Sequence, residues 1–301
     1  MSIESVDPDS IGRLEEHRPL APPQVGQLQD VSGPSALGGG WRRGLELLYL
    51  MASMEFKRAY FGAALGYLWT IGRPLMLFGV LLVVFTEGLH LGNAVPHYPV
   101  LLLLNIVLFS FFTEGAGTAL PSIVSAEAIV RKTQFPRLVI PVASVLTALF
   151  NLALNLIVTF IFIIAVGGIT PMWTWLLMPV LVALIVVFTV ALAMILSSLY
   201  PRFRDVAMVW SVASTALFYA TPVIYVIDRF SLPLRKILSV NPLAVILELA
   251  RQWIIDPHAP GPAMAVNSRL FLLVPAAVYL VICVLAVRVF RREAPRIAEA
   301  L

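Results

Sequence analysis

The sequence predicts an all-α polytopic membrane protein with six transmembrane helices, an N-terminal amphipathic interface helix and an outer-leaflet re-entrant helical hairpin. Three observations indicate this class: 59% of the 301 residues are hydrophobic, 13% are charged, and the mean hydropathy is +0.90. A soluble domain is about 45–50% apolar and about 25% charged. The bilayer is therefore the solvent for most of this chain.

The charged residues give the chain a formal net charge of +4. In a membrane protein Lys and Arg set the orientation and contact anionic lipid, so this basic balance indicates membrane lipid and no nucleic acid as a partner. Cys283 is the only cysteine, which excludes an intrachain disulfide and a metal site built from several cysteines.

The first 40 residues are polar, with scattered prolines and a glycine run. Such a segment buries too little apolar surface to offset the entropy of ordering, so we expect a disordered cytosolic tail over 1–40 and a membrane domain over 41–301. The tail lacks the basic start and apolar core of a signal peptide.

Residues 41–62 predict a helix that lies in the membrane interface. A polar face adjoins an apolar side, which is typical of a helix with one face in water and the other at the acyl boundary. A helix packed on protein has the same pattern, so both interpretations stay open. The polar face holds Arg42, Glu46, Ser53 and Lys57, and the apolar side Leu45, Leu48, Ala52 and Phe56.

Six apolar segments are each close to the length of about 20 residues that a helix needs to cross the hydrocarbon. The third is long enough to tilt or to project beyond the membrane. Six spans place both termini on one side. The segments are 72–90, 99–119, 139–167, 175–199, 207–227 and 268–290.

The positions of Lys and Arg predict the orientation of these spans. With the N-terminus inside, the 21 basic residues divide sixteen to five in favour of the inner side, so we expect both termini in the cytosol. The five outer residues are Arg229, Arg235, Lys236, Arg251 and Arg269.

Residues 228–267 are too polar to cross the membrane, yet their stretch LAVILELARQWII is too apolar for water. A re-entrant helical hairpin that enters from the outer face and is buried against protein satisfies both conditions. Glu248 and Arg251 lie three residues apart on this helix and can pair.

The sequence lacks the motifs of common catalytic sites. It has no G-x-x-x-x-G-K-[ST] loop for ATP, no G-x-S-x-G and no H-E-x-x-H, so we expect no enzymatic activity in this chain. Glu114 is the only acidic residue well inside a predicted span, whereas ion-coupled transport usually leaves several there. A helix-end or pore-wall carboxylate with a basic partner is the alternative interpretation of Glu114.

Five motifs follow one another along the chain. EFKRAYFGAALGYLWTIGRPL (55–75) and VRKTQFPRLVIPVASVL (130–146) precede FRDV (203–206), TPVIY (221–225) and NPLAVILELAR (241–251). Together they resemble the membrane subunit of ABC-2-type polysaccharide exporters, which move lipid-linked O-antigen, teichoic acid or cell-wall galactan. The matching positions in the first two motifs are Lys57, Arg58, Tyr60, Leu65, Gly66, Trp69, Pro74, Lys132, Phe135, Pro136, Arg137 and Pro141.

The resemblance implies a coupling loop over 120–138 that docks on a separate ATPase, and this ATPase would bind the ATP and Mg²⁺. An apolar plug, a proline bend and cations suit such an interface. A basic loop that follows the positive-inside pattern would explain the cations but not Phe135 and Pro136. The coupling residues are Arg131, Lys132, Phe135, Pro136, Arg137, Arg202, Arg204 and Asp205.

The resemblance also implies a homodimer with two ATPase subunits in a bacterial inner or plasma membrane, and a path for the polymer. Aromatic side chains offer stacking surfaces to sugar rings, although each one fits the interfacial aromatic belt equally well. Glu114 stands where the resemblance leads us to expect an uncharged residue. The path candidates are Tyr60, Phe61, Trp69, Glu114, Tyr219 and Tyr225.

Other functions stay open on the sequence. A secondary flippase would need carboxylates at the midplane and often inverted repeats. A membrane glycosyl- or acyltransferase would need a catalytic acid or base near the interface. Neither pattern is evident in the sequence. Export of drugs or small lipids by an ABC-2 transporter is the closest alternative.

Overall fold

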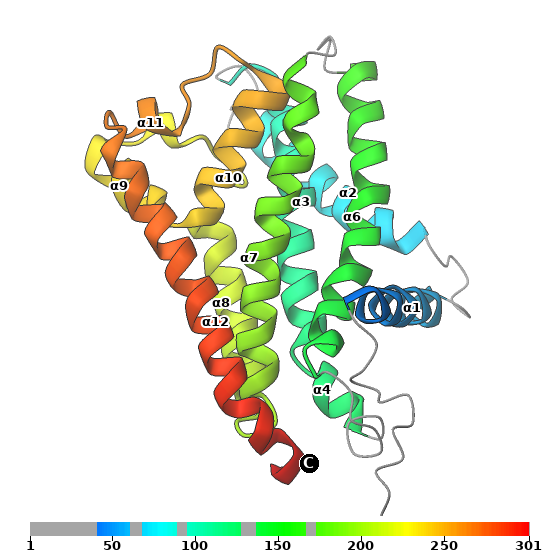
Figure 1. Cartoon of the computed structure of the whole chain (residues 1–301). Helices are drawn as coiled ribbons and strands as arrows, with labels where there is room; N and C mark the ends of the chain where they lie inside the picture. Colours follow the sequence, from blue (N-terminus) through cyan, green and yellow to red (C-terminus); the bar gives the residue numbers. More distant parts are fainter. Residues whose placement is uncertain (1–40, 61–67, 89–94, 128–136, 167–172, 301) are drawn as a thin grey trace, which may run out of the picture. The chain divides into compact units, whose positions relative to one another are not determined.

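The computed structural model describes residues 41–60, 68–88, 95–127, 137–166 and 173–300. Within these residues every regular element is a helix, and no strand occurs (Figure 1). The predicted all-α class is therefore confirmed. The predicted tail over 1–40 lies outside the described residues.

Five helical stretches of the described chain are long and apolar enough to cross a membrane. They match the predicted spans 72–90, 99–119, 139–167, 175–199 and 268–290. The elements are α2 (Leu68–Val83) with η2 (Val84–Gly88), α3 (Tyr98–Ala119), α6 (Val139–Val166), η4 (Trp173–Leu177) with α7 (Met178–Leu199), and η7 (Leu270–Leu272) with α12 (Leu273–Ala300).

The predicted span over 207–227 ends earlier than expected. Its helix, α8 (Val206–Ala220), has 15 residues, which gives about 22 Å against a hydrocarbon thickness of about 30 Å. The helix stops because Thr221 is extended (φ −99°, ψ 142°) and precedes Pro222, whose ring disfavours helical backbone in the residue before it. A sixth crossing at this position stays a prediction.

α3 is the central helix of the bundle. It packs against α2, α6, α7, α8 and α10 (Pro242–Ala250). In the 18-residue apolar stretch of α3 that is long enough to cross a membrane, 78% of the residues are buried, against 17% in the corresponding stretch of Leu68–Gly88. Gly115 allows this close packing, because a Cβ there would lie 2.9 Å from Thr189 Cγ2 of α7 and 3.6 Å from Ala148 Cβ of α6.

α1 (Trp41–Tyr60) lies crosswise to the long helices and packs against α6 (Figure 1). Ala52 is fully buried there, and Thr147 Oγ1 of α6 donates a hydrogen bond to its carbonyl (3.2 Å). Glu46 and Lys57 are exposed on the polar face. Part of the predicted apolar side is thus packed on protein, and the location of α1 in the membrane interface stays a prediction.

The segment predicted to be re-entrant forms short helices at one end of the bundle, the hairpin end (Figure 1). α10 is buried between α3, α7 and α12, so this part of the segment is buried against protein as a re-entrant helix requires. The other helices are η5 (Ile227–Arg229), α9 (Leu232–Ser239), η6 (Arg251–Ile255) and α11 (Pro262–Ala265).

Candidate functional site

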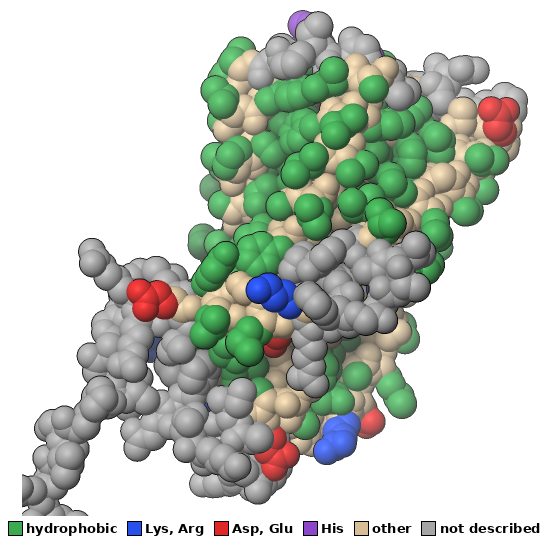
Figure 2. Space-filling view, turned by 90° about the vertical axis from the view of Figure 1, so that its right-hand side faces the viewer, with side chains coloured by type: hydrophobic (Ala, Val, Ile, Leu, Met, Phe, Trp, Pro, Cys, Tyr) green, Lys and Arg blue, Asp and Glu red, His purple; other side chains and the backbone are tan. Residues whose placement is uncertain are grey.

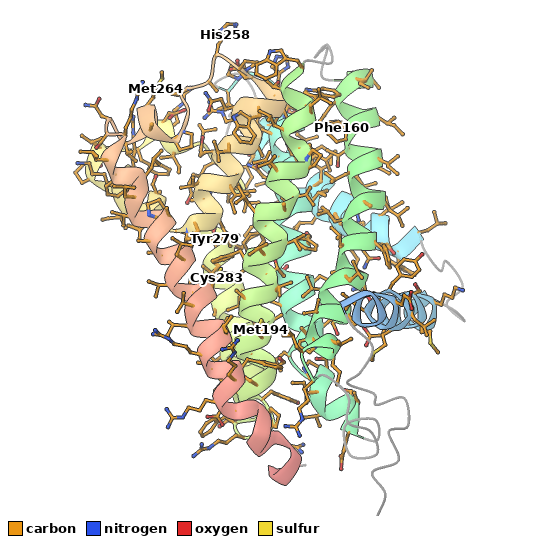
Figure 3. All side chains as sticks on the ribbon, in the orientation of Figure 1. Phe160, Met194, His258, Met264, Tyr279 and Cys283 are labelled. Atoms are coloured by element: carbon orange, nitrogen blue, oxygen red, sulfur yellow. The ribbon has the colours of Figure 1, made fainter. Side chains whose placement is uncertain are left out.

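The opposite end of the bundle, the α4 end, is formed by α4 (Ser122–Ser125), the start of α6, the turn 200–205 and the end of α12 (Figure 1). Buried side chains hold these segments together. Ile123, Ile140, Met194 and Phe290 join α4, α6, α7 and α12 in one apolar cluster, and Figure 3 shows Met194 toward this end.

The predicted coupling residues that the structure describes lie at the α4 end. Arg137 is half-buried in the turn before α6. Arg202 and Arg204 are exposed, and the Arg202 guanidinium lies 5.1 Å from the ring centre of Phe203. Asp205 is exposed and directly precedes α8. The remaining coupling candidates lie outside the described residues; they are Arg131, Lys132, Phe135 and Pro136.

A strip of polar side chains interrupts the apolar surface of α3. This polar strip consists of Ser110, Thr113, Glu114 and Thr118, which are half-buried or exposed on an otherwise buried helix. Their spacing of three and four residues places them on one face. Polar groups inside a spanning helix are costly when they face lipid, so such a face normally borders protein or a water-filled cavity.

The two threonine hydroxyls of the polar strip use their hydrogens within their own helix. Thr113 Oγ1 lies 3.2 Å from the Phe109 carbonyl, and Thr118 Oγ1 donates to the Glu114 carbonyl at 2.8 Å. With the donor used, each hydroxyl oxygen still has acceptor capacity. Together with the carboxylate of Glu114, the strip therefore offers hydrogen-bond acceptors along about two turns of α3.

Glu114 is held by α6 and borders α2. Asn151 Nδ2 of α6 donates to Glu114 Oε1. The positive charge of Arg73 on α2 is near enough to interact with the same carboxylate. Trp69 precedes Arg73 by one helical turn and is 42% exposed, so it lies on the same side of α2.

A proline in α2 explains a second contact between α6 and α2. In a regular helix the Thr70 carbonyl would accept from residue 74, but Pro74 has no N–H. Asn155 Nδ2 supplies the missing donor, with 3.2 Å to the Thr70 oxygen. The same amide also donates to the Asn151 carbonyl at 2.9 Å, which links the two asparagines of α6.

α8 borders the polar strip near Gly117 of α3. Its Trp210 covers Gly117, where a Cβ would lie 3.4 Å from the indole Nε1. Ser211 and Thr215 of α8 are exposed. The Thr215 hydroxyl donates to the Ser211 carbonyl at 3.0 Å, so its own oxygen can still accept a hydrogen bond. The helix next to α3 thus also carries exposed hydroxyls.

The predicted path residues fall into separate groups. Tyr225 Oη donates to the Tyr219 carbonyl at 3.0 Å, and the Tyr219 side chain is 63% exposed on α8. Trp69 and Glu114 belong to the α2 and α3 side. Phe61 and the side chain of Tyr60 lie outside the described residues.

Of the polar strip, only Glu114 was predicted from the sequence as a path residue, and the hydroxyl-bearing residues around it were not. Their three- and four-residue spacing around Glu114 was the signal that could have found them.

The TPVIY motif forms a non-helical segment, 221–226, that is buried inside the bundle. Side chains of α3 satisfy its carbonyls: Tyr98 Oη donates to Ile224 O at 2.9 Å, and Asn105 Nδ2 donates to Pro222 O at 3.0 Å. Non-helical backbone at membrane depth is tolerated only where it is buried in protein or lines a cavity. This segment meets that condition, because it is buried in protein and the side chains of Tyr98 and Asn105 donate hydrogen bonds to its carbonyls.

Asn241, the first residue of the NPLAVILELAR motif, is hydrogen-bonded to the same segment. Asn241 Oδ1 accepts from the Leu243 N–H at 3.0 Å and so caps the start of α10. Its Nδ2 donates to Thr221 Oγ1 at 2.8 Å. One asparagine therefore caps the start of α10 and ties this helix to the segment that follows α8.

A buried charge cluster closes the hairpin end. Arg251 Nη1 lies 3.4 Å from Glu248 Oε2, which confirms the predicted pair, and 2.8 Å from Asp228 Oδ2. The Ile227 N–H also donates to Glu248 (3.4 Å). Burial raises the pKa of Glu248 to about 7, and the neighbouring Asp228 carboxylate adds to the rise while Arg251 opposes it.

Comparison with known proteins agrees with this architecture. Residues 46–255 match the ABC-2 type transporter family, so the chain belongs to this family and is a membrane component of a transporter. The O-antigen export system permease protein RfbA of Klebsiella pneumoniae is 31% identical over 202 residues, which cover 66% of this chain and 76% of that protein. A protein of the same name from Myxococcus xanthus is 27% identical over 259 residues, covering 85% and 95%. The resemblance seen in the motifs is confirmed.

Proposed function

We propose that this chain is the membrane-spanning permease subunit of an ABC transporter that exports a lipid-linked polysaccharide across a bacterial inner or plasma membrane. The relatives named as O-antigen export permeases support this substrate class. O-antigen-, teichoic-acid- and galactan-like polymers all carry many hydroxyl groups. The polar strip on α3 is the observation that carries the proposal.

The polar strip suits a hydroxylated chain that must slide. Its acceptors are spread along α3 and continue at Ser211 and Thr215 of α8, so a passing hydroxyl can exchange one acceptor for the next. A small apolar drug would gain nothing from such a surface. Ring faces of the polymer would stack on Trp69 toward the α4 end and on Tyr219 farther along, with Tyr60 and Phe61 as further candidates.

The energy for export comes, on this proposal, from a separate ATPase that binds ATP and Mg²⁺. The described residues Arg137, Arg202 and Arg204 put exposed or half-buried cations at the α4 end, and Arg137 belongs to the predicted coupling loop 120–138. Cations at such a surface favour an acidic partner. This end faces the cytosol in the proposed orientation, with both termini inside.

A second copy of the chain completes the path. On α8 the side chains of Met208, Val209 and Val212 are between 65% and 74% exposed next to the hydroxyls of Ser211 and Thr215. One chain thus leaves the polar strip open along one side. A homodimer would cover the apolar positions and enclose the polar ones.

Depletion of the chain in its native cell tests the proposal. We expect a lipid-linked polysaccharide to accumulate on the inner leaflet while the surface polymer declines, because synthesis continues without export. Identification of the accumulated species by mass spectrometry is the readout. Accumulation of a drug or small lipid, with surface polymer unchanged, would instead assign the chain to small-molecule export.

A further inference from the structure

A groove of about 670 Å³ lies between α1, α2 and α6. Its size falls within the range of about 300–1,000 Å³ that is usual for ligand sites. The walls from the long helices are apolar and include Ile71 of α2 and Phe150, Ala153 and Leu154 of α6. The ring of Tyr49 on α1 meets Phe150 edge to face, with 6.2 Å between centroids.

The polar groups of the groove come from α1. Lys57 is exposed and adds a cation to the lining. Ser53 also lines the groove, and because its hydroxyl donates to the Tyr49 carbonyl at 2.6 Å, its oxygen can accept another hydrogen bond. Figure 2 shows this face, with hydrophobic side chains covering the long helices in its upper part.

We infer that this groove binds one acidic glycerophospholipid of the bilayer, with its phosphate at Lys57 and an acyl chain along Ile71, Ala153 and Leu154. The cation complements an anionic headgroup, and the crosswise α1 places it at the edge of two apolar helices that extend into the membrane (Figure 1). The lipid would bridge α1 to α2 and α6.

The lining of the groove favours a lipid over a protein segment. A polypeptide would bring backbone N–H and C=O groups that need partners in an apolar environment. The long-helix walls of the groove are apolar side chains, which satisfy no such groups but accommodate an acyl chain. Lipid binding in this groove requires only that the chain lies in a membrane, whatever substrate it exports.

Native mass spectrometry of the purified full-length protein tests the site. The probe is an equal mixture of phosphatidylglycerol and phosphatidylethanolamine. Wild-type protein should retain phosphatidylglycerol preferentially under conditions that strip other lipids. Lys57→Gln should lower this preference about fivefold, as expected for one charge at a membrane surface. Ala153→Phe should remove the retained lipid by filling the groove.

Matched variants on α12 serve as controls. Arg288→Gln removes an exposed cation, and Val281→Phe enlarges a side chain that is 54% exposed. Both should retain lipid as wild type does. Ile71→Phe is a second filling variant in case Ala153→Phe fails to fold, which size-exclusion elution would reveal. Equal retention by all folded variants, or loss without headgroup preference, would overturn the inference. So would a polyprenyl-linked lipid occupying the groove in protein from native membranes.

Discussion

Replacing Arg251 by Met should strongly destabilise the hairpin end. Arg251 is 8% exposed and is the cation between Asp228 at 2.8 Å and Glu248 at 3.4 Å, with Glu248 only 4% exposed. Removing one partner of a buried ion pair costs about 3–5 kcal/mol, because a charge is left uncompensated. Because Asp228 and the ionised form of Glu248 both lose their cation, we expect a loss within that range at about pH 8.

The loss caused by Arg251→Met should shrink as the pH falls. Burial already raises the pKa of Glu248 to about 7, and removal of the opposing cation raises it further. Protonated Glu248 carries no charge, so the variant should recover part of its stability at about pH 6 compared with about pH 8.

Thermal unfolding of detergent-purified protein, followed by fluorescence-detected size exclusion, measures these effects. Arg269→Met removes an exposed cation from the same end and serves as the control, with an expected change within about 0.5 kcal/mol. Wild-type stability of Arg251→Met would refute the reasoning. A loss that is equal at both pH values would show that Glu248 does not titrate as described.

The same assay checks three further predictions. Wild-type stability should fall as the pH rises from about 4.5 to about 7, because folded Glu248 holds its proton more tightly than the unfolded chain does, and Glu248→Gln should flatten this slope. Gly115→Val should cost about 1–3 kcal/mol by overpacking, since its Cβ would lie 2.9 Å from a methyl carbon of α7; Gly79→Val, with nothing within 4 Å, is the control, and equal effects would contradict the packing account. Asn105→Leu should cost about 1–3 kcal/mol by leaving buried carbonyls of 221–226 without donors, and an unchanged melting temperature would argue against this hydrogen bonding.

The long helices could be predicted because each one is an uninterrupted apolar segment of about 20 residues or more, the length that a helix needs to cross the hydrocarbon. The span predicted over 139–167 is α6, Val139–Val166, and that over 99–119 is α3, Tyr98–Ala119. The early end of α8 could not be predicted in the same way. Pro222 is a local signal for the end of the helix, but the composition stays apolar through 221–226, and the donors that satisfy the carbonyls of this segment come from Tyr98 and Asn105, more than a hundred residues earlier.

The sites were predictable where they depend on local spacing. Glu248 and Arg251 pair across three residues of one helix, whereas Asp228 joins them from 23 residues away and was missed. Likewise, the contact of Asn151 with Glu114 spans 37 residues and two helices. The hydroxyls around Glu114 were visible in the sequence, but Ser and Thr in spanning helices commonly bond their own backbone, so their spacing alone did not mark a path.

Reconstituted transport tests the central claim most directly. The chain and its ATPase subunit would be placed together in proteoliposomes with a lipid-linked polysaccharide, and an impermeant lectin would detect polymer on the far side. We predict transfer that requires both chains and ATP, and that falls when Phe135 and Arg137 are replaced by Ala while membrane insertion is unchanged. Polymer transfer by this chain alone, driven by an ion gradient, would contradict the account. ATP-driven export of small amphiphiles without any polymer would contradict it equally.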